Sequence, residues 1–218
     1  MLTTTSWIPR VILGVLLALS LTLVEGKSMD EKIQKRIAEA AHTEYGWKQD
    51  QIRVDELEEL RRPTCSFYTA GNTVRPLSYE GNYALLPGNH VVGIGDDQAA
   101  AKILDTCSEG TSAKWWAEII TRFTGDLGSG LVLGDENERP DIVRKLADAH
   151  LKFTVPTFGD NKRSVSFLLL DAEHYILYRV EAKRAADGKV EVAKTRLLEG
   201  RSGAAAADPV DSISGMLH

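Results

Sequence analysis

The stretch that decides the fold runs from Ser164 to Leu197 and reads SVSFLLLDAEHYILYRVEAKRAADGKVEVAKTRL. Apolar side chains recur at every second position in three segments: Val165, Phe167 and Leu169; Ile176, Tyr178 and Val180; Val190 and Val192. His174 stands two positions before Ile176 and begins the second segment. Asp171-Ala172-Glu173 and Ala186-Asp187-Gly188 separate the segments with residues typical of turns. This period of two predicts an antiparallel meander of three strands with one face against a core.

Upstream of this stretch, four segments carry the 3.6-residue periodicity of amphipathic helices. They begin at Ser28 or Asp30, at Asp96 or Asp97, at Thr111 or Ser112, and near Pro140. Short apolar runs between them, among them residues 64–69 and 82–86, predict further strands. The sequence therefore predicts an α+β fold, with about four helices packed on an antiparallel sheet that ends in the three-stranded C-terminal meander.

The composition is that of an ordinary globular protein. Of the 218 residues, 43% are hydrophobic and 26% are charged, so residues 27–199 are predicted to form a single globular α+β domain. The net charge of −5 and the scattering of Lys and Arg among acids give no reason to expect a nucleic-acid partner. Residues 200–218 offer little to bury, which predicts a disordered tail.

The N-terminal segment has the pattern of a secretory signal. Arg10 precedes an apolar run over residues 11–24, and charged sequence begins at Glu25. The run is short for the roughly 20 apolar residues that span a bilayer, which predicts a signal peptide over residues 1–26. We therefore expect an exported protein, periplasmic or extracellular. The alternative is an uncleaved N-terminal anchor, which would be its one attachment to a membrane.

The chain has two cysteines, Cys65 and Cys107. An even number in an oxidising compartment predicts one disulfide. Cys65 lies on the same side of its predicted strand as Phe67, and Cys107 ends the apolar stripe of a predicted helix. Both sulfurs are therefore expected to point inward.

The stretch HVVGIGDDQAAAK, residues 90–102, combines a strand, two glycines and a helix start, as nucleotide-binding segments do. The third glycine of a dinucleotide fingerprint is missing, and Asp96 and Asp97 place negative charge where a phosphate would bind. We interpret the two acids as helix caps. No cofactor is expected.

An acidic loop contains residue types that can bind calcium. It contains Asp126, Asp135, Glu136, Glu138 and Asp141. Their spacing does not match an EF-hand loop, so a solvated loop at the start of a helix is the preferred interpretation. The five histidines form no zinc-binding pattern, and no metal site is expected.

Trp115 and Trp116 are adjacent in a predicted helix. Their rings diverge by roughly 100 degrees, so we expect one in the core and the other at its rim. A rim tryptophan beside glycine-rich loops would offer a ligand or partner surface. The alternative is that both serve core packing alone.

His174 begins the segment HYILYRV, and with the hairpin that follows this segment resembles the histidine strand of papain-like cysteine peptidases. The resemblance implies a nucleophile at Cys107 and a general base at His174. The predicted disulfide opposes this, because it would consume the thiol of Cys107.

No other catalytic pattern stands out, so our leading hypothesis is a non-catalytic binding or assembly module for a protein or small-molecule partner. The alternative is a papain-like cysteine hydrolase that uses Cys107 and His174.

Overall fold

The computed structural model describes residues 30–74, 80–96, 98–125, 127, 130–159 and 162–199. The predicted signal peptide, residues 1–26, and the predicted tail, residues 200–218, lie outside these ranges. Asp97 and Asp126 also lie outside them.

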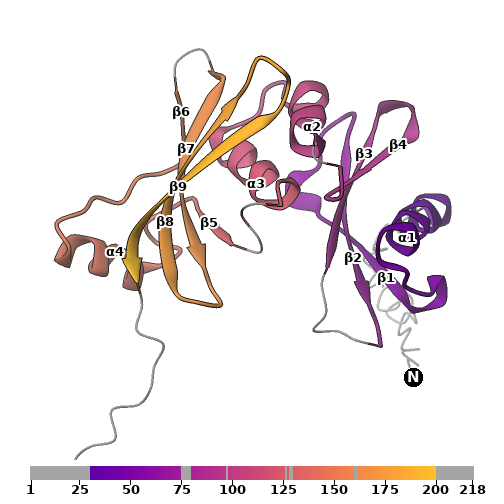
Figure 1. Cartoon of the computed structure of the whole chain (residues 1–218), viewed down its shortest axis with the longest axis horizontal. Coiled ribbons are helices and arrows are strands. Elements are labelled where there is room, and N and C mark those ends of the chain that lie inside the picture. The colour runs from indigo at the N-terminus through magenta and orange to yellow at the C-terminus, as the bar shows by residue number, and fades with distance from the viewer. Residues whose placement is uncertain are drawn as a thin grey trace, which may run out of the picture.

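The strands form two antiparallel sheets (Figure 1). The N-terminal sheet has the order β1 (Ile52–Glu56), β2 (Ser66–Asn72), β3 (Gly81–Leu86) and β4 (His90–Gly93). The C-terminal sheet has the order β5 (Leu131–Leu133), β7 (Ser164–Asp171), β8 (Ile176–Arg184) and β9 (Val190–Glu199), and β6 (Thr157–Phe158) also pairs with β7. The α+β class and the meander are confirmed, but the strands are divided between two sheets rather than gathered in one.

Four helices complete the described fold: α1 (Glu31–Tyr45), α2 (Ala99–Cys107), α3 (Ala113–Phe123) and α4 (Pro140–Asp148). There are three short 3-10 helices: η1 (Gln49–Gln51) between α1 and β1, η2 (Glu58–Leu60) between β1 and β2, and η3 (Pro87–Asn89) between β3 and β4. Helices and sheets alternate across the molecule, with α1 outside the N-terminal sheet, α2 and α3 between the sheets, and α4 outside the C-terminal sheet (Figure 1). None of the helices in the described ranges is both long and apolar enough to span a membrane.

Three buried clusters hold these layers together. In the largest, α2 and α3 lie between Phe67 of β2 and Phe167 of β7, both fully buried. A second cluster packs Ile37 and Ala41 of α1 on the opposite face of the N-terminal sheet. The third packs α4 on the opposite face of the C-terminal sheet. Each sheet therefore has at least one helix packed on each of its two faces.

Strand β7 has leucines where α4 packs on it and serines where α4 does not. Phe167 and Leu169 point to the central cluster, while Leu168 and Leu170 point to α4. On that α4-facing side the strand begins with Ser164 and Ser166, which are not part of the α4 cluster. The change from serine to leucine on one face marks the edge of the area that α4 covers.

Cys65 and Cys107 are paired, with a sulfur–sulfur distance of 2.02 Å. They are 2% and 3% exposed, so the predicted pairing and the inward direction of both sulfurs are confirmed. The bond links the start of β2 to the end of α2 across the central cluster.

Candidate functional site

A pocket of about 480 Å³ lies between α1 and the edge of the N-terminal sheet. Helix α1 contributes Glu39, Ala40, Thr43 and Glu44, which share one face because they are spaced by one turn. The sheet contributes Tyr83, Val91 and Gly93, and the segment that follows β4 contributes Gly95 and Asp96. We call this the Glu44 pocket, after the residue at its centre.

Tyrosines hold the Glu44 carboxylate in place. The hydroxyl group of Tyr83 donates a hydrogen bond to Glu44 Oε2 at 2.9 Å. Burial, and next to it the negative charge of Glu44, raise the pKa of Tyr83 far above its ordinary value. Burial and the contact with Glu44 raise the pKa of Tyr45 to about 12. Both phenols therefore stay protonated at neutral pH and remain donors to the carboxylate.

Two glycines let the carboxylate lie directly against the backbone. A Cβ atom at Gly93 would lie 3.0 Å from Glu44 Oε2, and one at Gly95 would lie 3.0 Å from Oε1. Gly93 is also the register partner of Tyr83 in the β3–β4 ladder. A side chain at either position would therefore push the carboxylate out of its present place.

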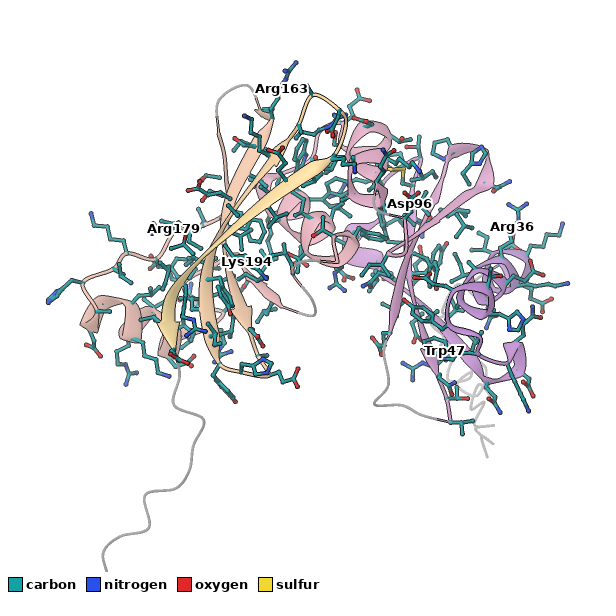
Figure 2. All side chains as sticks on the ribbon, viewed as in Figure 1. Arg36, Trp47, Asp96, Arg163, Arg179 and Lys194 are labelled. Atoms are coloured by element: carbon teal, nitrogen blue, oxygen red, sulfur yellow. A yellow bond between two sulfur atoms is a disulfide. The ribbon has the colours of Figure 1, made fainter. Side chains whose placement is uncertain are left out.

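The pocket carries negative charge. Its acidic residues are Glu39, Glu44 and Asp96, and no Lys, Arg or His is among the residues that line it. Asp96, on the segment that joins β4 to α2 (Figure 2), is paired with Lys102, and Glu39 lies 3.9 Å from Lys35. Glu44 forms no ion pair with any residue in the described ranges. It is the carboxylate left available to a cation.

Part of the segment HVVGIGDDQAAAK, residues 90–102, lines this pocket. Asp96 Oδ1 accepts a hydrogen bond from Gln98 N at 3.0 Å, and the Asp96 carbonyl accepts one from Ala99 N at 2.8 Å. Lys102 lowers the pKa of Asp96 through a hydrogen bond. The N-cap residue of α2 is Gln98, which makes no side-chain cap hydrogen bond. The prediction that Asp96 caps this helix is therefore wrong, because the helix begins at Ala99 and the Asp96 carboxylate binds the amide of Gln98, just before it.

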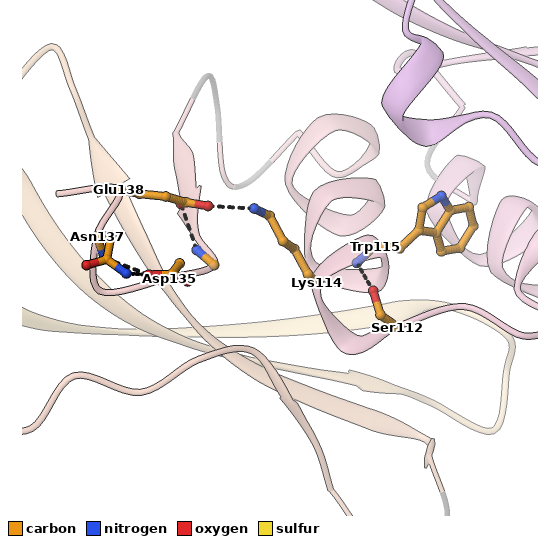
Figure 3. Close-up of polar contacts among 7 residues, drawn as sticks. Ser112, Lys114, Trp115, Asp135, Asn137 and Glu138 are labelled. Carbon is orange, nitrogen blue, oxygen red and sulfur yellow. Dashed lines mark hydrogen bonds and ion pairs between the residues drawn. The ribbon is translucent and has the colours of Figure 1, made fainter.

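Three carboxylates of the acidic loop, those of Asp135, Glu138 and Asp141, have protein partners, and Figure 3 shows the first two. Glu138 accepts hydrogen bonds from Lys114 Nζ at 2.7 Å and from Gly134 N at 2.9 Å. Asp135 accepts two from Asn137. Asp141 is paired with Arg139, whose hydrogen bonds lower the pKa of Asp141 to about 2. Among the residues placed by the structure, no cluster of His, Cys, Asp or Glu suits a metal ion.

Trp115 and Trp116 contact different sheets. Trp115 packs edge-to-face with Phe67 of β2 and donates its indole N–H to the carbonyl of Leu60 at 2.9 Å. Trp116 packs edge-to-face with Phe158 of β6 and donates to the hydroxyl group of Thr111 (3.1 Å). Their exposed fractions are 3% and 8%, so neither ring lies at a rim. Because α3 runs between the sheets, both diverging rings are covered.

Cys107 and His174 lie far apart. Arg184, the last residue of β8, forms an ion pair with Asp105, two residues before Cys107 on α2. His174 precedes the other end of β8, and nine strand residues span roughly 30 Å. Its Nδ1 atom lies 2.9 Å from Asp171 Oδ2, and this hydrogen bond raises the pKa of His174. The structure does not bring the imidazole to the sulfur, which is held in the disulfide.

Reasoning from the sequence missed Glu44 and Tyr83 as site residues. The signal for this site in the sequence is the pair Gly93 and Gly95, since glycines allow close approach of a group to the backbone. The fold defines an α+β protein with two helix-covered sheets. The chain matches no protein-family model, no curated protein and no solved structure. The geometry of the Glu44 pocket therefore carries the functional argument.

Proposed function

We propose that the protein is an exported, non-catalytic binding module whose Glu44 pocket takes the cationic group of a ligand. The observation that carries the proposal is the Glu44 carboxylate, which has no cationic partner in the described part of the chain and is held by a Tyr83 hydrogen bond of 2.9 Å. A carboxylate fixed in this way binds a cation without a further loss of side-chain freedom. An ammonium or guanidinium group supplies the donors that it accepts.

The small free energy of an exposed ion pair restricts the kind of ligand that this pocket can bind. Glu44 is exposed, and such pairs contribute only about 0.2–1 kcal/mol. Affinity therefore requires apolar contact as well, at roughly 25 cal/mol per Å² of buried surface. Ala40 and Val91 supply an apolar wall beside the acids. The combination favours a cation at the end of an alkyl chain, as in a lysine or arginine side chain.

Binding is favoured over catalysis by the state of the candidate nucleophile and base. Cys107 forms a disulfide, and a thiol in that state is no nucleophile. His174 is paired with Asp171 at the opposite end of β8. Tyr83, which lines the Glu44 pocket, and Tyr45, next to Glu44 in the sequence, have raised pKa values, so both phenols act as donors rather than as bases.

The test compares a cation with its neutral counterpart. Nα-acetyl-arginine amide and Nα-acetyl-citrulline amide have nearly the same shape, but the second carries no charge. We expect the arginine compound to bind with an affinity that falls as salt is added, and the citrulline compound to bind up to about fivefold more weakly, the difference that an exposed ion pair supplies. Calorimetric or NMR titration gives both constants.

Two matched variants test whether the arginine compound binds at Glu44. Glu44→Gln removes the charge and keeps the shape, so it should weaken binding of the arginine compound several-fold. Glu58→Gln removes an exposed acid of η2, outside the pocket, and should leave binding unchanged. Equal binding of the two compounds, or equal effects of the two substitutions, would refute the proposal.

A further inference from the structure

A second hollow, of about 430 Å³, lies on the C-terminal sheet across β6, β7, β8 and β9. On this face, which points away from the central cluster, the polar side chains form two rows across the strands. Thr157, Ser166 and Glu181 are register partners in one row, and Ser164 and Lys183 are partners in the next. We call this the hydroxyl groove, defined by Thr157, Ser164 and Ser166.

The groove exists because small residues stand among long ones. Ser164 and Ser166 are flanked by the long side chains of Glu181 and Lys183 on β8. Gly159 contributes no side chain, and a Cβ atom there would collide with the hydroxyl group of Ser164. The α4 cluster covers the sheet only from Leu168 onward, so the serine half of this face stays open.

The polar groups of the groove have no partners among the described residues. The side chains of Thr157, Ser164 and Ser166 form no hydrogen bond with any residue that the structure places, and Glu181 and Lys183 form no ion pair there. Other hydroxyl groups of the chain do find partners: that of Thr124, for example, donates to a carbonyl oxygen at 2.6 Å. The groove therefore presents free donors and acceptors to a ligand.

We propose that the hydroxyl groove binds a saccharide. Each serine or threonine hydroxyl both donates and accepts, Glu181 accepts, and Lys183 donates, which matches the mixed hydroxyl groups of a sugar. The charged residues at the groove are Glu181, Lys183 and Glu191, two acids and one base on neighbouring positions, so no strong net charge selects an ionic ligand.

A peptide fits this face less well. Peptide recognition commonly relies on pockets for apolar or aromatic anchors. Four of the apolar residues at the groove belong to the central cluster or pack against it, on the other side of the sheet: Phe158, Val165, Ala182 and Val192. The fifth, Ala193, is the register partner of Glu181 and is too small to hold an anchor. The inference is independent of the Glu44 pocket, because α1 lies beyond the N-terminal sheet, on the far side of the molecule (Figure 1).

The test uses cellohexaose, chitohexaose, maltohexaose and xylohexaose, with a neutral hexapeptide of serine, glutamine and alanine beside them. Each is titrated into isotopically labelled protein and followed by amide NMR shifts. We expect at least one hexasaccharide to shift amides of β6 to β9, and the hexapeptide to shift none.

Three variants test the location. Ser166→Val removes a hydroxyl group, and Ala193→Trp fills the groove from β9; each should weaken saccharide binding at least tenfold. Thr195→Val makes the same kind of change on β9, outside the residues that line the groove, and should leave binding unchanged. The inference is overturned if no hexasaccharide binds, if only the hexapeptide binds, or if Ser166→Val and Ala193→Trp both bind like the wild type.

Discussion

The hydroxyl group of Tyr83 donates a hydrogen bond to Glu44 Oε2 at 2.9 Å and so joins β3 to the last turn of α1. Tyr83 is 1% exposed, whereas Glu44 is exposed. A buried ring thus presents its polar end at the surface of the Glu44 pocket. The contact serves the packing of α1 and the position of the carboxylate together.

The first prediction concerns the strength of this contact. In a double-mutant cycle, Tyr83→Phe and Glu44→Gln should show a coupling of about 0.5–1 kcal/mol, because the acceptor is charged but exposed. Urea unfolding of the four proteins measures it. Strict additivity of the two single effects would mean that the hydrogen bond adds nothing to stability.

The second prediction concerns the disulfide. Cys65 and Cys107 are separated by 42 positions, and closing a loop of that length stabilises a fold by about 4 kcal/mol in the chain-entropy model. The double variant Cys65→Ala, Cys107→Ala should lose roughly 2–4 kcal/mol. Denaturant unfolding gives the loss. Thiol titration of the unreduced, denatured wild type should find no free thiol, and two titratable thiols would contradict the pairing.

The third prediction concerns His174. Its hydrogen bond to Asp171 raises its pKa above 6.5, so the imidazolium favours the folded state at pH values below the ordinary pKa of histidine. This contribution should fade as pH rises through the raised pKa. An NMR pH titration should show a midpoint above 6.5 in the wild type and a lower midpoint in Asp171→Asn.

The matched control for His174 is Glu173→Gln. Glu173 contributes the smallest of the causes that raise the pKa, so this variant should lower the midpoint less than Asp171→Asn does. Equal midpoints in all three proteins would contradict the role of Asp171.

A fourth prediction tests the area that α4 covers. Leu168, fully buried, contacts the α4 cluster, so Leu168→Ala should cost about 2–5 kcal/mol. Ser166 lies two residues earlier on the same face, outside that cluster, and Ser166→Ala should change stability by less than about 0.5 kcal/mol. Thermal or urea unfolding separates the two. Similar losses at both positions would mean that the cover extends further along β7.

The fifth prediction concerns residues 1–26, which lie outside the described ranges. If they form a signal peptide, the exported protein should begin near Lys27, because the apolar run is short for a membrane span. Mass spectrometry of the secreted or periplasmic fraction identifies the terminus. An intact Met1 on membrane-bound protein would indicate an anchor instead.

Local patterns in the sequence were sufficient for the helices, the meander and the cysteine pair. The alternation from Val165 to Val192 depends only on which neighbours share a face of a strand, and the structure has those strands. The pairing of Cys65 with Cys107 followed from there being two cysteines with inward-facing patterns. Such signals lie within a few residues of one another, where helix and strand geometry determine direction.

Tertiary structure decided everything that depends on which faces meet. Alternation does not say which helix covers a face, so the division into two sheets was missed. Trp115 and Trp116 were expected to differ in exposure, yet both are buried because α3 lies between the sheets. Glu44 and Gly93 are 49 positions apart in the sequence and carry no shared pattern. They meet because burying the apolar side of α1 on the N-terminal sheet places one acid of its polar side beside a strand that ends in glycine.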